Sequence, residues 1–343
     1  MPKYTAVHRN PQGPGDDRPT AIQIVQDEGL TGKLEGKVVL ITGANRGIGL
    51  ETARAIHTTG ASIYLGVRDL ASGQRAIDDI SASNPDSKGK LHLIELTLDS
   101  LASVRRCAEK FLAQTNTLNV LILNAAAMSE TREQTVDGFE KVFATNHLGH
   151  HLLFHLLKLA LLASSTPERH SRVVSVSSQV HRATEIRFDD LNLEKGYDRL
   201  VAYSHSKLAN IYLANEIERR YGSRGVHGLS LHPGLIITNI NRDSLERCQN
   251  QKRPALGGRY NELKPLIKST SQGAATTVYA ALSAEWEGRG GKYLNDCKEA
   301  GAVDPHSHLF SSDAGYSPWA FDEEKAARLW VESNRMVGFP GDS

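Results

Sequence analysis

The sequence predicts a doubly wound α/β fold, in which helices cover both faces of a parallel sheet. From Lys37 onward, short runs of β-branched residues alternate with longer helical segments, which is the pattern of repeated βαβ units. The strand segments are almost continuously apolar, as strands buried on both faces are. A glycine-rich turn directly follows the first strand, in the position that suits a bound phosphate group. Together these observations favour three layers, αβα.

The elements can be placed in order along the chain. We expect right-handed crossovers between the parallel strands, and Gly60 stands where the first of these helices should end. The predicted strands are 37–42, 61–67, 91–96, 120–123, 172–176 and 226–231, and the predicted helices between them are 47–58, 70–82, 101–114, 136–162 and 201–221.

The regular alternation stops after Pro233. Residues 239–268 are polar and irregular, and a long stretch of this kind in a compact enzyme favours a substrate lid. We expect a helix at 271–283, a last strand at 291–294 and a final amphipathic helix at 322–336.

The chain is expected to form a single domain with extensions. Residues 36–300 are the predicted cofactor-binding catalytic domain, and residues 301–343 are a C-terminal loop and helix packed on it. Residues 1–35 are an N-terminal extension, part of which is rich in Pro, Gly and Asp, a loop composition. Within it, residues 21–25 form a short segment that can pack on the body. We interpret the extension as a surface feature, with a functional arm as the alternative.

Composition excludes several classes of protein. Of the 343 residues, 40% are hydrophobic, and 40 basic against 39 acidic residues leave a net charge of +1, without the basic excess of a nucleic-acid binder. Three cysteines are too few for a disulfide framework. No apolar run approaches the ~20 residues of a membrane span, and the first 20 residues lack the apolar core of a signal peptide. We expect a soluble, cytoplasmic protein, with a homo-oligomer left open.

The glycine-rich turn, residues 42–49, indicates a dinucleotide site. Glycines at 43, 47 and 49 let the backbone approach a ligand where a Cβ would collide. A pyrophosphate can then be bound by the free N–H groups at the start of the following helix. The residues assigned to this cradle are Gly43, Asn45, Arg46, Gly47, Ile48 and Gly49.

The end of the second strand favours NADP(H) over NAD(H). NAD-binding folds carry an acidic residue there for the ribose hydroxyls, whereas this chain has Val67 followed by Arg68. An arginine attracts and pairs with a 2′-phosphate. Arg46, in the glycine-rich turn, adds a second positive charge.

Tyr203 and Lys207 are the candidate acid–base pair. They stand four positions apart on a predicted helix and so share one face. A neighbouring ammonium should lower the pKa of the phenol and suit it to proton transfer. A second such pair, Tyr260 and Lys264, lies in the irregular region. Only the first pair follows a strand that ends in serines, with Ser178 at the sheet edge where α/β folds bind ligands.

Taken together, these motifs resemble the short-chain dehydrogenase/reductase family, over residues 36–300, and imply a Rossmann-type sheet. Residues 42–49 are similar to its TGxxxGxG turn, and residues 233–238 to its PGxxxT segment. The resemblance implies a catalytic tetrad of Asn146, Ser178, Tyr203 and Lys207, with Asn146 anchoring a water chain to Lys207. It further implies cofactor contacts at Thr97, Leu98, Asn124, Ala125, Ala126, Tyr203, Lys207, Pro233, Gly234, Ile236 and Thr238.

A narrower resemblance is to the branch of retinol dehydrogenases and WW-domain oxidoreductases. It rests on several segments, 67–69, 146–150, 203–210, 231–234, 291–297 and 327–330, and on the 25-residue step from Ser178 to Tyr203. Two departures stand out. The family's NNAG segment reads Leu-Asn-Ala-Ala at 123–126, and the acidic residue after the third strand is Thr97.

These inferences predict an NADP(H)-dependent oxidoreductase that interconverts a carbonyl and an alcohol. The branch resemblance implies a lipophilic small molecule such as a retinoid, a steroid or a polyketide-like natural product, with reduction as the expected direction. An isomerase, epimerase or cyclase that uses the cofactor without net redox is the alternative, followed by a non-catalytic NADP(H) sensor. A metal site on His147, His150, His151 and His155 is disfavoured, because no carboxylate or cysteine completes it.

Overall fold

The computed structural model describes residues 3–237, 263–304, 307, 309 and 315–340. Its centre is an eight-stranded sheet in the order β10-β9-β6-β5-β4-β1-β2-β3. All neighbours are parallel except β10 with β9. The strands are β1 (Val38–Thr42), β2 (Ser62–Val67), β3 (Leu91–Glu95), β4 (Val120–Leu123), β5 (Ser171–Val176), β6 (Val226–His232), β9 (Lys292–Asn295) and β10 (Lys298–Glu299). The predicted doubly wound fold is confirmed, and its strand order reverses between β1 and β4.

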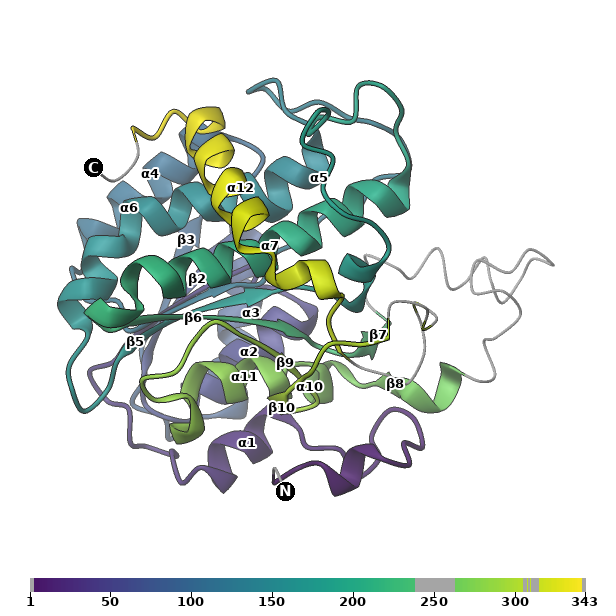
Figure 1. The fold of residues 1–343 in the computed structure, drawn as a ribbon. Helices are drawn as coiled ribbons and strands as arrows, with labels where there is room; N and C mark the ends of the chain where they lie inside the picture. The colour runs from purple at the N-terminus through teal and green to yellow at the C-terminus, as the bar shows by residue number, and fades with distance from the viewer. Residues whose placement is uncertain (1–2, 238–262, 305–306, 308, 310–314, 341–343) are drawn as a thin grey trace.

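Two layers of helices cover the sheet, one on each face (Figure 1). One layer holds α4 (Leu101–Leu112), α6 (Gly149–Ser164) and α7 (Arg199–Tyr221), with α12 (Glu323–Met336) packed outside α7. The other holds α1 (Ala21–Asp27), α2 (Gly47–His57), α3 (Leu70–Ser83) and α11 (Ala275–Leu282).

The core is divided by the sheet into two parts. Leu40 and Leu121 pack with the α4, α6 and α7 layer, while Val39, Ile41 and Ile122 pack with the α1, α2 and α11 layer. Successive strand residues thus point to opposite faces. Because both faces are buried, these strands need to be apolar at every position, which is the pattern that predicted the fold.

Two predicted helices are interrupted. The segment expected to be helical at 136–162 begins only at α5 (Lys141–Phe143), where the Glu140 carboxylate accepts from two backbone N–H groups and caps the helix. A π-helical turn, Ala144–Leu148, then separates α5 from α6. The segment expected at 271–283 divides into α10 (Thr270–Gly273) and α11.

A small two-stranded sheet lies beside the main one. Its strands, β7 (Leu235–Ile236) and β8 (Ile267–Lys268), pair in parallel. They and β10 have two residues each, too few to give a sequence pattern. None of the helices among the described residues is long and apolar enough to cross a membrane.

The N-terminal segment is folded onto the body of the protein. Ile24 and Val25 of α1 are fully buried and belong to the core that α11 shares. Tyr4 packs edge-on against Tyr279 of α11, with ring centres 6.0 Å apart. The segment therefore contributes to the core. Packing of residues 21–25 on the body was expected from the sequence, whereas the contact made by Tyr4 was not.

Candidate active site

One large cleft, of about 1360 Å³, lies at the carboxyl ends of the parallel strands. It exceeds the usual size of a small-molecule pocket, so a dinucleotide and a second molecule both fit. The predicted residues that line it are Gly43, Asn45, Arg46, Gly47, Ile48, Gly49, Arg68, Thr97, Leu98, Asn124, Ala125, Ala126, Ser178, Tyr203, Lys207, Pro233, Gly234 and Ile236. Asn146 is not among the lining residues. Thr238 and residues 239–262 of the predicted lid lie outside the described part of the chain.

The glycine-rich turn needs its glycines for geometric reasons. Gly43 and Gly47 have φ angles of +67° and +58°, a region that disfavours residues with a Cβ. A Cβ on Gly49 would lie 2.3 Å from the carbonyl oxygen of Gly43. The turn can therefore present backbone N–H groups at the start of α2, where the helix dipole favours an anion.

Thr42 and Asn124 hold this turn in place. The Thr42 hydroxyl accepts from the backbone N–H groups of Asn124 and Ala125 at 2.9 and 3.0 Å. The Asn124 side chain donates in return to the carbonyl of Thr42 at 2.9 Å. The one asparagine that the chain retains from the NNAG segment thus stabilises the turn backbone.

Two arginines lie beside the glycine-rich turn, Arg46 within the turn itself and Arg68 directly after β2. Arg46 and Arg68 are both exposed and line the cleft, and within the described residues neither forms an ion pair. The nearby Asp69 carboxylate accepts from the N–H groups of Ala71 and Ser72 and caps α3. Asn45 donates to the Ser72 hydroxyl at 3.0 Å, a contact the sequence did not suggest.

Tyr203 and Lys207 are brought together on α7, facing the cleft. The Lys207 ammonium lies 5.5 Å from the centre of the Tyr203 ring and donates to the carbonyl of Val176 at 3.0 Å. Burial lowers the pKa of Lys207 to about 7. Burial also raises the pKa of Tyr203 to about 12, while a hydrogen bond with Ser178 opposes the rise. Burial is the main influence on the pKa of this phenol, and the lowering by Lys207 expected from the sequence stays a prediction.

Ser178 follows β5 by two residues and is the N-cap of a short 3-10 helix, Gln179–Arg182. Its hydroxyl accepts weakly from the Val180 N–H at 3.3 Å, and its interaction with Tyr203 lowers the pKa of that phenol. Ser178 thus both caps the 3-10 helix and interacts with Tyr203. Its position leaves it half-buried on the cleft wall.

Asn146 lies in the π-helical turn and is fully buried. Its side chain accepts from the Ala127 N–H at 2.6 Å and donates to the Ala127 carbonyl and to the Ser206 hydroxyl. The Asn146 side chain therefore joins the loop after β4 to α7. Its partner on α7, Ser206, directly precedes Lys207 in the sequence. π-Turns inside α-helices often mark functional positions, and this one places Asn146 between those two elements.

Comparison with known proteins identifies the family. The family model for short chain dehydrogenases matches residues 37–249. Short-chain dehydrogenase/reductase prx1 of Penicillium roqueforti is 46% identical over 335 residues, which is 98% of this chain and 95% of the relative. The chain belongs to the short-chain dehydrogenase/reductase family.

Other members of the family agree with the branch that the sequence suggested. Oxidoreductase calI of Penicillium decumbens is 45% identical over 100% of this chain and 99% of its own. Retinol dehydrogenase 12 of Mus musculus is 39% identical over 89% of this chain and 88% of its own. A solved structure from Mycobacterium paratuberculosis superposes with a TM-score of 0.63 at 32% identity, covering 90% of this chain and 96% of that one.

The sequence missed a part of the cleft wall. His8 and Arg18 of the N-terminal segment line the cleft, as do Lys268 and Asp296. No motif covers His8 or Arg18, and the N-terminal composition indicated only a loop. Lys268, in contrast, is the last residue of the predicted lid, and Asp296 lies in the segment 291–297 that resembles the retinol dehydrogenase branch. The competing Tyr260 lies outside the described residues, whereas its partner Lys264 begins a short 3-10 helix.

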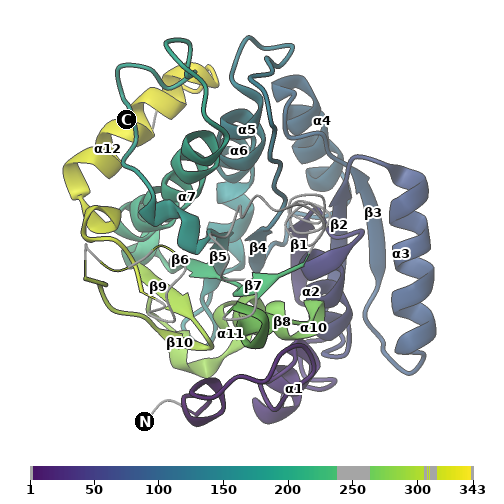
Figure 2. The same ribbon diagram turned by 90° about the vertical axis from the view of Figure 1, so that its right-hand side faces the viewer.

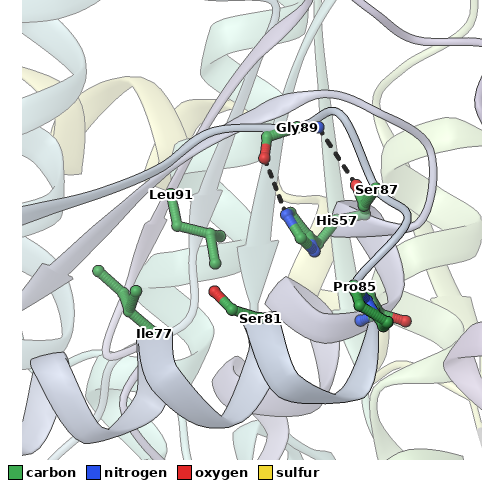
Figure 3. Close-up of a pocket in the computed structure, with 8 residues that line it drawn as sticks. His57, Ile77, Ser81, Pro85, Ser87, Gly89 and Leu91 are labelled. Carbon is green, nitrogen blue, oxygen red and sulfur yellow. Dashed lines mark hydrogen bonds between the residues drawn. The ribbon is translucent and has the colours of Figure 1, made fainter.

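A second, much smaller hollow of about 240 Å³ lies at the opposite edge of the sheet (Figure 3). His57 at the end of α2 bonds the Gly89 carbonyl at 2.9 Å, and the Gly89 N–H donates to Ser87. The amino ends of parallel strands are not where this fold binds ligands. The hydrogen bonds of His57 and of the Gly89 N–H hold the loop before β3 in place.

The histidines of the α5–α6 region have structural partners. His150 lies between Thr42 and the carbonyl of Asn146, at 2.9 Å from each. His147 and His151 instead bond Ser333 and Asn334 of α12 at 2.8 Å. The latter two thus attach the C-terminal helix to α6.

Proposed function

We propose that this member of the family is an NADP(H)-dependent oxidoreductase that reduces a carbonyl on a lipophilic small molecule to an alcohol. The observation that carries the proposal is the convergence of Tyr203, Lys207 and Ser178 on one wall of a cleft whose far end holds a glycine-rich turn and two arginines. NADPH supplies the hydride when it is bound.

The residues of the cleft fit the cofactor. A Cβ on Gly49 would collide with the Gly43 carbonyl and with the Asn124 side chain, so a glycine there keeps the turn in the shape that a pyrophosphate needs. The 2′-phosphate would lie between Arg46 and Arg68, where Asp69 is already engaged with the start of α3. A 2′-phosphate offers these guanidinium groups bidentate hydrogen bonds. Pro233, Gly234 and Ile236 would lie against the nicotinamide end.

Tyr203 is proposed as the proton donor. With a pKa raised to about 12 by burial, its phenol stays protonated at neutral pH and can donate to a carbonyl oxygen. Ser178 would hold the same oxygen by a hydrogen bond. Lys207, with a pKa lowered to about 7, can return a proton to the phenolate. Asn146 supports this relay by holding the loop after β4 against α7.

The apolar part of the cleft supports a lipophilic substrate. Leu200 and Ile237 are 42% and 37% exposed, and both line the cleft together with Met128, Val180 and Leu235. Exposed apolar side chains that gather in a concave site mark a binding surface. Retinoids, steroids and polyketide-like products are lipophilic molecules that suit such a lining. The name of retinol dehydrogenase 12 supports the same class of substrate.

The decisive experiment is a screen for NADPH oxidation with ketones and aldehydes of those three classes. Turnover with at least one of them is expected, and Tyr203→Phe should abolish it while NADPH still binds. Product formation without net NADPH consumption would favour an isomerase, epimerase or cyclase instead. Retained turnover in Tyr203→Phe would exclude the mechanism. A cytoplasmic location stays a prediction from the sequence.

A further inference from the structure

The N-terminal segment 3–18, here called the arm, runs along the lower side of the molecule to β8 and α10 (Figure 2). It is held there by hydrogen bonds to residues about 250 positions later in the chain, such as Gly15 N–H to Gln272 at 3.0 Å. The Gln272 side chain donates in turn to the backbone carbonyls of Asp16 and Arg18. The arm and α10 thus form one hydrogen-bonded unit.

Arg18 makes the main hydrogen bonds between the arm and the backbone around β8. Its side chain is 4% exposed and its guanidinium donates to the carbonyls of Leu266 and Ile267 at 2.9 and 2.7 Å. It also pairs with Asp16 at 2.8 Å. Buried guanidinium groups are costly unless every donor is used, so this arrangement fixes the backbone that it bonds.

The segment fixed by Arg18 packs against the Pro233–Gly234 turn. β8 pairs with β7, which directly follows this turn. The stem of Lys268 lies so close that a Cβ on Gly234 would be 2.8 Å from its Cδ. Gly234 itself has a φ of +105°. The arm is thereby connected, through β8 and β7, to the part of the cleft assigned to the nicotinamide.

A second contact between the arm and the rest of the protein lies on the cleft wall itself. The Lys268 ammonium bonds the Asp296 carboxylate at 2.6 Å, and His8 of the arm faces the same oxygen at 3.6 Å. All three line the cleft. Asp296 has a φ of +53°, a conformation that a non-glycine residue adopts only where its surroundings hold it.

We propose that the arm is a built-in wall of the nicotinamide end of the cleft, with Arg18 as a positioning residue. The inference rests on the proposed dinucleotide site but not on the proposed carbonyl substrate. Arg18 acts through β8 and the Pro233–Gly234 turn and does not touch the phosphates. Its loss should therefore affect the nicotinamide end and spare the adenosine end.

The test compares two ligands on the full-length protein, NADPH and 2′,5′-ADP, which lacks the nicotinamide. In Arg18→Leu the affinity for NADPH should fall about tenfold relative to 2′,5′-ADP, as expected for the loss of an ordered contact region. Arg54→Leu is the matched control, because Arg54 pairs with Glu51 and Asp79 away from the cleft and should leave the ratio unchanged. NADH with ADP-ribose replaces this pair where NADH binds more tightly.

The outcomes separate the two proposals. An unchanged affinity ratio in Arg18→Leu would overturn the role of the arm, whatever the enzyme reduces. Arg18→Lys, which keeps the charge with fewer donors, should give an intermediate ratio and serves where the leucine variant fails to fold. If the unaltered protein binds neither NADPH nor NADH, both proposals are overturned. If it binds a dinucleotide but reduces no carbonyl, only the proposed reaction is overturned. If the unaltered protein is active, Arg18→Leu should lower kcat by a larger factor than it raises the KM for NADPH.

Discussion

The hydroxyl of Thr42 and the Nε2 atom of His150 lie 2.9 Å apart, at the junction between the glycine-rich turn and α6. Since the same hydroxyl accepts from two backbone N–H groups, it donates its own proton to the imidazole. His150 then donates from Nδ1 to the carbonyl of Asn146. One neutral histidine therefore connects the cofactor turn with the π-helical turn. Burial lowers the pKa of His150 to about 3, which keeps it neutral.

Thr42→Val should disrupt this junction. Valine has nearly the same shape but leaves the N–H groups of Asn124 and Ala125 without their acceptor, and the free energy of unfolding should fall by about 2–3 kcal/mol. Urea denaturation measures the change. Thr52→Val is the control, since the Thr52 hydroxyl is buried and has no partner among the described residues. Equal losses in the two variants would contradict this account.

Arg68 should determine the preference for NADPH. Arg68→Asp replaces an attraction for the 2′-phosphate by a repulsion, so the KM for NADPH should rise about 10- to 100-fold while that for NADH changes little. Arg75→Asp makes the same charge change at an exposed position of α3 outside the cleft. Initial-rate kinetics with both cofactors give the comparison. Unaltered preference in Arg68→Asp would count against an NADP(H) enzyme.

The reductive reaction should slow at alkaline pH. Lys207 has a pKa lowered to about 7 by burial, and in the proposed mechanism its ammonium form returns a proton to Tyr203. As the pH rises through that value the acid form is lost, so kcat for reduction should fall by roughly tenfold per pH unit above the apparent pKa. The oxidation of the alcohol should show the opposite slope. A reductive kcat that increases from pH 6 to 9 would exclude this role for Lys207.

The contact between α6 and α12 should make the protein sensitive to acid. Phe339 stacks on the His155 ring at 4.2 Å, and burial lowers the pKa of His155 to about 2. The unfolded chain binds a proton near pH 6.5 and the folded protein does not. The stability contributed by neutral His155 is thus complete above pH 6.5 and falls by about 2 kcal/mol on going to pH 5.

His155→Phe keeps the stacked ring and removes the titration. Its unfolding free energy should therefore decline less between pH 7 and pH 5 than that of the unaltered protein. His92→Phe provides the comparison, because His92 also stacks on an aromatic ring, Tyr64, but is only half-buried. Parallel curves for His155→Phe and the unaltered protein would show that this histidine does not contribute.

The main sheet could be predicted from the sequence because its strands are buried on both faces and joined by helices of ordinary length. The bounds of β4 and of α3 differ from prediction by at most one residue. The break at Ala144–Leu148 could not be predicted, since its sequence, Ala-Thr-Asn-His-Leu, contains no proline or glycine to mark a change in the helix. Asn146 was correctly singled out as a helix residue, but its partners Ala127 and Ser206 follow from tertiary packing.

The cofactor half of the site was easier to predict than the wall beside it. Glycines at 43, 47 and 49 are required by backbone geometry, and such requirements are visible in the sequence. Arg18 has no local signal, because its partners at 265–267 are far away in the chain. The effect of burial on the pKa of Tyr203 could not be predicted for a similar reason, since burial depends on the whole fold and the tyrosine–lysine spacing carries no information about it.

The hydrogen bond between Arg18 and Ile267 joins residues 249 positions apart. Contacts between such distant positions form late, because the intervening chain must first be ordered. During synthesis the arm emerges early, yet its binding partners on β8 and α10 are made only after most of the sheet. We therefore expect the side of the cleft next to the Pro233–Gly234 turn to be among the last regions to fold. A chain that ends before residue 265 would contain the glycine-rich turn but not the residues to which the arm binds.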